Sequence, residues 1–239
     1  MGSISNGKLI LNGYISRAKS KVMNEVKIGD QIWATENLST INFNNGDEIP
    51  MVDPNSFSQE WRFQKKWEKT GDLKEAACCY FKGDPQSKAS NGVLYNWFAL
   101  VDPRGICPEG WRIPTIQDFE ELAMFLGGQK TIVDINEIYG ENKHYLNFTE
   151  KLKSTDDWED NKLGSGDSNF NLKPYGYITA TGSWNPQFKL TCTKLWTQSE
   201  IIDGYQNGFA FSPFFVEYHM YLDRTVKNSG IPIRCIKEI

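Results

Sequence analysis

The sequence predicts an α+β protein in which two helices pack on a small, loop-rich, mainly antiparallel sheet. Helical patterns come early in the chain, whereas strand-like patterns cluster after residue 175. Helices that are segregated from a group of neighbouring strands are typical of the α+β class. The length of 239 residues suits one large domain. A chain of this length buries about 70% of its unfolded surface, which is ample for a hydrophobic core.

The clearest predicted element is a helix that follows a turn and a short strand at residues 108–113. Thr115 is a good N-cap residue, and Asp118 stands three positions later, where a capping box places its second partner. Apolar residues then recur at the i, i+3, i+4, i+7 spacing of one buried helix face: Phe119, Leu122, Ala123 and Leu126. Gly127-Gly128 ends the helix. We expect the rest of the chain to pack on this helix.

Three segments before this helix also carry patterns. Residues 26–38 predict a strand hairpin that turns at residues 29–30. Aromatic residues near position 60 fit one helix face: Phe57, Trp61 and Trp67. Residues 94–100 predict either a buried strand or a short helix.

Patterns after the central helix are shorter. Residues 132–141 are ambiguous, and residues 147–157 predict a second, shorter helix with Phe148 and Leu152 on one side. Short alternating runs then predict five strands, at residues 175–180, 194–198, 208–212, 217–222 and 231–236.

Charge argues against a nucleic-acid partner, and hydropathy argues against a membrane span. The net charge is −4, from 26 basic and 30 acidic residues. A nucleic-acid-binding surface needs a basic stripe, but the only adjacent basic residues are Lys65 and Lys66, which we interpret as part of a solvated face. No run approaches the ~20 apolar residues of a membrane span, and no secretory signal is visible near the start. We expect no nucleic-acid partner and no membrane span.

The cysteines and histidines give no metal-binding pattern. The five cysteines are Cys78, Cys79, Cys107, Cys192 and Cys235. Their number is odd, so at least one is free or pairs between chains. None belongs to a CxxC motif, and the chain has only two histidines, so a zinc site is not expected. We assign no metal ligand and no cofactor.

Several motifs resemble one known family. Tyr-Asn-Trp-Phe-Ala at residues 95–99 is followed by Cys-Pro-Glu-Gly-Trp-Arg-Ile-Pro-Thr at residues 107–115. Other segments fit in the same order, at residues 26–38, 44–50, 79–85, 195–200 and 231–236. Together they resemble the Fibrobacter succinogenes major paralogous domain family from residue 26 to residue 239. Several motifs in the right order make this resemblance specific.

The resemblance implies a C-type-lectin-like fold related to the formylglycine-generating enzyme group, and it implies no established activity. It also implies a disulfide between Cys107 and Cys235, which match recurrent positions of the family; two buried thiols are the alternative. An enzyme is not expected, because the C-terminal cysteine pair of the formylglycine-generating relatives is missing. Calcium-dependent sugar binding is not expected, because neither a Glu-Pro-Asn or Gln-Pro-Asp loop nor a Trp-Asn-Asp strand is present.

The last strands and their loops form the usual ligand face of a lectin-like fold, so they supply the candidate site. Tyr and Trp offer large, stiff contact areas, and Asn or Gln adds adaptable hydrogen bonds. The candidate ligand-binding residues are Trp184, Trp196, Gln198, Glu200, Tyr205, Asn207, Tyr218 and Tyr221. In a regular strand, Tyr218 and Tyr221 cannot both point outward, because they are three positions apart.

We divide the chain into an N-terminal attachment arm, residues 1–25, and a C-type-lectin-like domain, residues 26–239. The arm has too few apolar side chains to form a core, so we expect it to join an oligomer or larger assembly. The expected function is non-enzymatic recognition or adhesion, with a surface glycan or protein as ligand, in an extracellular setting on a bacterial surface or a phage virion. The alternatives are a structural fibre or decoration subunit of a virion and, more distantly, a formylglycine-generating-type enzyme.

Overall fold

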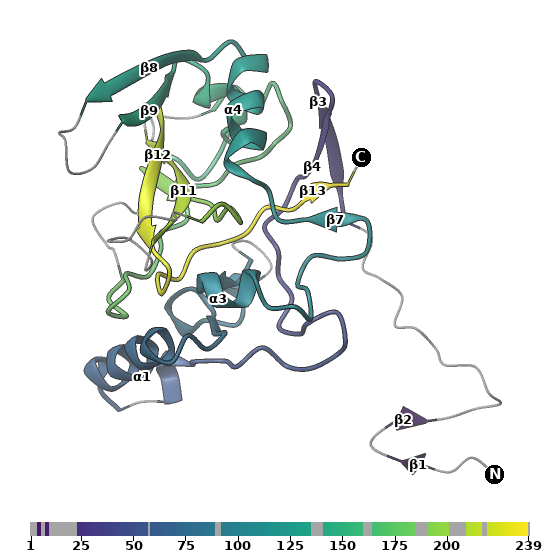
Figure 1. Ribbon diagram of the computed structural model, residues 1–239, viewed down its shortest axis with the longest axis vertical. Helices are drawn as coiled ribbons and strands as arrows, with labels where there is room; N and C mark the ends of the chain where they lie inside the picture. The colour runs from purple at the N-terminus through teal and green to yellow at the C-terminus, as the bar shows by residue number, and fades with distance from the viewer. Residues whose placement is uncertain are drawn as a thin grey trace.

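The computed structural model describes residues 4–5, 8–9, 23–56, 58–88, 92–134, 141–159, 164–184, 191–200, 209–216 and 219–238. In this part of the chain the fold is α+β with antiparallel strand pairing, as predicted (Figure 1). The strands form two larger sheets and two strand pairs within the described residues, where one small sheet was expected. One pair joins β1 (Ile4–Ser5) to β2 (Lys8–Leu9), and the other joins β5 (Cys78–Cys79) to β6 (Leu94–Tyr95).

The helices of the described residues are α1 (Glu60–Asp72), α3 (Trp97–Leu100), α4 (Ile116–Phe125) and α5 (Thr149–Leu152). α4 is the predicted central helix, and the capping box between Thr115 and Asp118 is confirmed. The helix predicted at residues 147–157 is reduced to the single turn α5, because Lys153 has an extended backbone and forms a β-bridge with Leu172. None of these helices is long and apolar enough to cross a membrane.

One larger sheet has the strand order β10-β11-β12-β9-β8. Its strands are β8 (Gln129–Asp134), β9 (Glu141–Leu146), β10 (Cys192–Lys194), β11 (Phe209–Val216) and β12 (His219–Val226). β11 and β12 pair along their full length, and β12 also pairs with β9, which comes much earlier in the chain. α4 packs against one face of this sheet, where the Phe119 and Phe215 rings lie 6.2 Å apart (Figure 1).

The other larger sheet has the order β3-β4-β13-β7. Its strands are β3 (Glu25–Ile28), β4 (Gln31–Ala34), β7 (Trp111–Arg112) and β13 (Ile236–Lys237). The predicted hairpin turn is present, and Gly29 has a φ of +63°, which favours glycine. A Cβ atom at this position would lie 2.9 Å from the Phe125 ring of α4. Since β13 lies between β4 and β7, the end of the chain supplies an inner strand.

α1 buries a different face from the one predicted. Its buried residues are Phe63, Trp67 and Thr70. Trp61, which was expected on the buried face with Trp67, is instead 47% exposed. The i, i+4, i+7 spacing selects Phe63 as the partner of Trp67, and the Trp67 indole N–H donates a 2.7 Å hydrogen bond to the Asn228 carbonyl oxygen. Phe57 lies outside the described residues.

The other predicted elements agree with the structure to different degrees. Residues 94–100 contain both predicted possibilities, the strand β6 and the short helix α3. Residues 175–180 form no regular strand, and Ile178 makes isolated β-bridges to Trp184 and Gly230. β11 and β12 overlap the strands predicted at residues 208–212 and 217–222 and are longer. β10 and β13 share only Lys194 and Ile236 with the strands predicted at residues 194–198 and 231–236, so those two predictions are mostly wrong.

Cys107 and Cys235 form a disulfide with 6.4 Å between their Cα atoms, which is the pairing that the family resemblance implies. The bridge connects the segment before β7 with the residue before β13. Cys78, Cys79 and Cys192 are buried thiols. Burial raises the pKa of Cys78 and of Cys192 to about 12. A thiol with such a pKa stays protonated at neutral pH and is a poor nucleophile.

Arg234 is buried next to this disulfide and joins three segments. Its guanidinium donates hydrogen bonds to Asn37 Oδ1 at 2.8 and 3.0 Å, to the Phe170 carbonyl at 2.6 Å and to the Ala34 carbonyl at 3.3 Å. No carboxylate of the described residues forms an ion pair with it. Burial lowers the pKa of Arg234 to about 10. Neutral acceptors therefore hold the closing segment in place.

Candidate ligand-binding face

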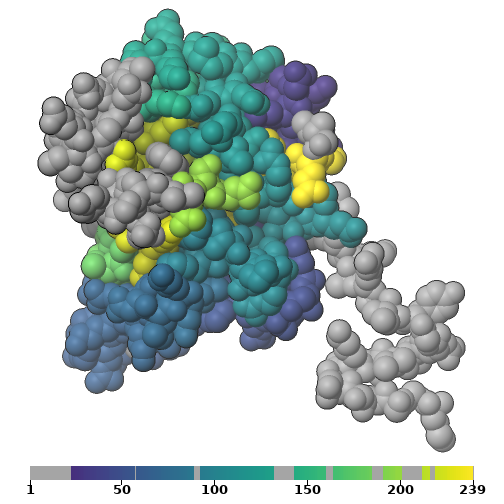
Figure 2. Space-filling view, in the orientation of Figure 1, coloured from purple at the N-terminus to yellow at the C-terminus, as the bar shows by residue number. Residues whose placement is uncertain are grey.

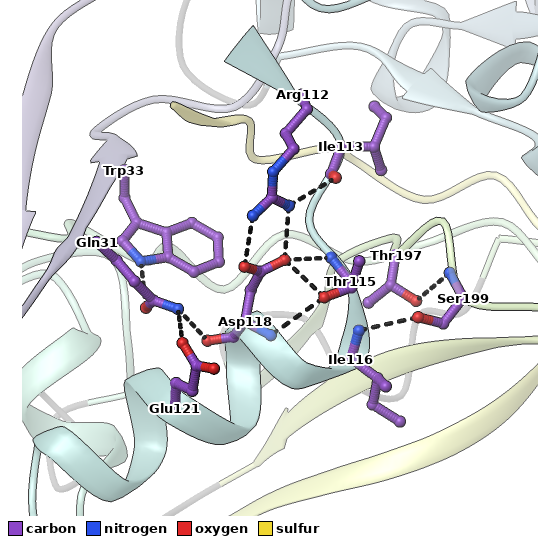
Figure 3. Close-up of polar contacts among 10 residues, drawn as sticks. All are labelled: Gln31, Trp33, Arg112, Ile113, Thr115, Ile116, Asp118, Glu121, Thr197 and Ser199. Carbon is purple, nitrogen blue, oxygen red and sulfur yellow. Dashed lines mark hydrogen bonds and ion pairs between the residues drawn. The ribbon is translucent and has the colours of Figure 1, made fainter. Parts of the chain in front are cut away.

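The motif at residues 107–115 ends in a polar network at the start of α4 (Figure 3). The Arg112 guanidinium donates to both carboxylate oxygens of Asp118 at 2.7 Å, and the Thr115 N–H donates to the same carboxylate at 2.6 Å. Burial disfavours the charged form of Asp118, but hydrogen bonds from Arg112 and Thr115 outweigh this effect and lower the pKa of Asp118. The network joins β7 to the first turn of α4, which is a structural role.

The start of α4 also holds the segment that carries three candidate residues, Trp196, Gln198 and Glu200. The Ile116 N–H donates to Ser199 Oγ at 3.0 Å (Figure 3). The Gln198 N–H donates to the Pro114 carbonyl at 2.9 Å. Residues 195–200 are therefore fixed against the beginning of α4 by the Ser199 hydroxyl and the Gln198 backbone N–H. The side chains of Gln198 and Glu200 remain exposed.

Trp196 is a core residue, so the structure removes it from the candidate face. Its side chain is fully buried, and its indole N–H donates a 2.7 Å hydrogen bond to the Tyr95 carbonyl oxygen. The neighbouring aliphatic and aromatic residues of this core include Ile231 and Ile233 of the closing segment. A fully enclosed indole cannot contact an external ligand.

Trp184 lies apart from the last strands. Its ring stacks on Phe63 of α1 at 5.9 Å and meets Phe81 edge-on at 5.5 Å, and it is half-buried. It belongs to the core cluster that holds α1 on the domain. The candidates Tyr205, Asn207 and Tyr218 lie outside the described residues.

Glu200 forms an ion pair with Lys227, whose ammonium group lies 4.3 Å from the centre of the Trp97 ring. Trp97 is 7% exposed. Its indole N–H is the one buried side-chain donor or acceptor among the described residues that has no hydrogen-bond partner. The Glu200 carboxylate is thus already paired with a buried cation. Of the two exposed candidates, Gln198 is therefore the more available for contact with a ligand.

Tyr221 is the candidate that the structure places best for contact with a ligand. Met220 and Leu222 on either side of it are buried in the core, so Tyr221 points to the opposite face of the five-stranded sheet, away from α4. It is half-buried there. The His144 ring lies edge-on to the Tyr221 ring at 4.3 Å, and the Tyr221 hydroxyl lies 3.2 Å from His219 Nδ1.

The same face continues across neighbouring strands, and we call it the outer face of the sheet. Its half-buried ring-bearing side chains are Phe214, Tyr221, His144 and His219. Lys194 lies at one side, with its ammonium group 2.5 Å from an Asp223 carboxylate oxygen and 5.2 Å from the Phe214 ring centre. Burial, with a smaller effect of the charge on His219, lowers the pKa of His144. This face combines rings with one ion pair.

The sequence did not reveal three residues of this face: Phe214, His144 and His219. The sequence contained a signal for His219, because it lies two residues before Tyr221 and therefore points to the same side of a strand. His144 could not be found in this way, since its position depends on the pairing of β9 with β12. Within the part of the chain that is described, no group of three or more His, Cys, Asp or Glu side chains is arranged to hold a metal ion.

The comparison with protein families gives one match. The model of the Fibrobacter succinogenes major domain matches residues 26–237, which is most of the chain and includes every motif discussed above. No curated protein and no solved structure matches the chain. Both the disulfide and the network at the start of α4 lie inside the matched range. The chain therefore belongs to the Fibrobacter succinogenes major domain family.

Proposed function

We propose that this protein is a non-enzymatic recognition domain of the C-type-lectin-like kind, and that it binds a surface glycan on the outer face of the five-stranded sheet. The observation that carries the proposal is the position of Tyr221 between His144 and His219, half-buried on the face away from α4. Half-exposed rings stack on the C–H faces of sugar rings, and polar groups beside them select the sugar by hydrogen bonds.

The chemistry of the outer face supports binding more than catalysis. The Lys194 ammonium group is already engaged by Asp223 and also lies 3.1 Å from Thr225 Oγ1. The Ser212 hydroxyl is 2.7 Å from the same Thr225 oxygen and is buried. These groups satisfy one another and make a rigid support for the rings. A rigid support lowers the entropy cost of binding.

An extracellular setting, on a bacterial surface or a phage virion, is part of the proposal. The Cys107–Cys235 disulfide supports it, because disulfides persist in oxidising surroundings and are rare in the cytosol of most organisms. Residues 1–25, which precede the family-matched region, are the proposed attachment arm.

The test is a printed array of bacterial and host glycans, probed with the full chain and with Tyr221→Ala. A truncated central aromatic contact typically costs about 2 kcal/mol, so Tyr221→Ala should weaken binding to a positive glycan about thirtyfold. Phe125→Ala is the matched control, since Phe125 is 63% exposed on α4 at the other side of the sheet. An array on which the full chain binds nothing, or binding that Tyr221→Ala retains, would contradict the proposal.

A further inference from the structure

α1 presents a second surface, which the outer face of the sheet does not include. The helix is fixed to the domain by Phe63, Trp67 and Thr70, and the Thr70 hydroxyl lies 3.1 Å from Asn228 Oδ1. The opposite side of the helix is exposed, and α1 lies at the lower left of the molecule (Figure 2). Because the buried side is well anchored, the exposed side is displayed in a fixed orientation.

The exposed side of α1 carries four cations in one stripe: Arg62, Lys65, Lys66 and Lys69. At 3.6 residues per turn they fall within a sector of about 100° and within about 10 Å along the axis. The three carboxylates of the helix fall outside this sector: Glu60, Glu68 and Asp72. None of the four cations forms an ion pair with a carboxylate of the described residues. The stripe is therefore a positive surface without ion pairs to described carboxylates, on a chain of net charge −4.

An exposed aromatic ring borders this stripe. Trp61 is 47% exposed, and its ring has the Lys65 ammonium group at 5.1 Å and the Arg62 guanidinium at 5.3 Å from its centre. Leu73, at the end of the helix, is 53% exposed. A large aromatic side chain beside unpaired cations offers a stacking surface together with charge. We propose that the stripe on α1, with Trp61, is a binding site for an acidic polysaccharide.

Three alternatives fit the stripe less well. A membrane-surface helix inserts its apolar face, but the apolar face of α1 is buried in the domain. Duplex DNA is bound through many phosphate contacts over a wide basic surface, whereas carboxylates border this short stripe. Single-stranded nucleic acid needs successive stacking rings, and α1 exposes one indole. An acidic polysaccharide fits better, because its carboxylate or sulfate groups can pair with the four cations and its sugar rings can stack on Trp61.

The test measures binding of the full chain to heparin and to polygalacturonate at low and moderate salt. Lys65→Gln/Lys69→Gln removes two cations from the stripe and keeps good helix formers in place. Lys27→Gln/Lys130→Gln is the matched control, because both lysines are exposed on strands and the net charge changes equally. The stripe variant should bind about tenfold more weakly at low salt and show a shallower salt dependence. The control variant should change less than about twofold.

Trp61→Ala separates the ring from the charge. It should weaken polysaccharide binding while the salt dependence remains that of the wild type, since no cation is lost. Helical circular dichroism checks that each variant is folded. Tyr221→Ala should leave heparin binding unchanged. A failure of the α1 proposal can therefore be distinguished from a failure of the proposal for the outer face of the sheet. Equal heparin binding by the stripe and control variants, no binding at low salt, or stronger binding to phosphatidylserine vesicles or oligo(dT) than to both polysaccharides would overturn the assignment.

Discussion

Replacing Asp118 by Ala should destabilise the domain more than any other single change in the network at the start of α4. The carboxylate accepts two 2.7 Å hydrogen bonds from Arg112 and completes the capping box with Thr115. Loss of a cap costs about 1 kcal/mol. The Arg112 contacts add about 1–2 kcal/mol after allowance for solvent, because the Arg112 side chain is 34% exposed and that of Asp118 is 10% exposed.

The expected total for Asp118→Ala is about 2–3 kcal/mol in the free energy of unfolding. For a domain of this size, that lowers Tm by about 4–12 °C. Urea unfolding with the disulfide intact measures the free energy directly. Thr115→Ala is the comparison: it removes a side-chain cap but leaves the Arg112–Asp118 pair in place, so it should cost only about 1 kcal/mol.

Acidification gives an independent check on the same residue. The folded-state pKa of Asp118 lies below its ordinary value of 3.8, so the ionised group stabilises the fold fully above that value. This contribution disappears as the pH falls through the lowered pKa. The difference in stability between wild type and Asp118→Ala should therefore be constant at neutral pH and shrink below pH 3.8. Equal costs for Asp118→Ala and Thr115→Ala, or a difference that acid does not change, would refute this reasoning.

Three further predictions concern the fold. Replacing Cys107 and Cys235 together by Ser should lower the free energy of unfolding by about 2–5 kcal/mol, because the bridge closes a sequence separation of 128 residues; a Tm that reducing agent does not change would contradict this. Gly29→Ala should cost about 1–2 kcal/mol, since φ is +63° and the Cβ atom meets the Phe125 ring. Adding Phe125→Ala should recover part of that cost in a double-mutant cycle. Trp196→Phe should lose about 1 kcal/mol of stability in urea unfolding and leave glycan binding unchanged, whereas lost binding with full stability would return Trp196 to the site.

Local signals predicted α4 well because everything that specifies it lies within a few residues. Thr115 and Asp118 cap the helix, and Phe119 and Leu122 face the core, so pattern and chemistry agree. The hairpin turn at Gly29 was predictable for the same reason. α1 shows where local patterns are insufficient. Either Trp61 or Phe63 could share the buried side of the helix with Trp67, and only packing against the core decides between them.

The two proposed binding surfaces were harder to predict than the helices and strands. The outer face of the sheet depends on β9 lying beside β12, and no local pattern encodes that pairing. In the sequence, Lys65 and Lys66 looked like an ordinary solvated pair. The structure adds Arg62 and Lys69 to the same side of α1 and shows that the stripe is a continuous exposed surface.

The inner position of β13 has a consequence for biosynthesis. This strand lies at the C-terminal end of the family-matched region, and the two residues before it are the buried Arg234 and the bridged Cys235. While a ribosome still holds these residues, the strands β4 and β7 lack the strand between them. A stalled nascent chain that ends at residue 232 should therefore remain sensitive to protease. The sheet of β3, β4, β13 and β7 is therefore completed only after residues 236–237 have left the ribosome.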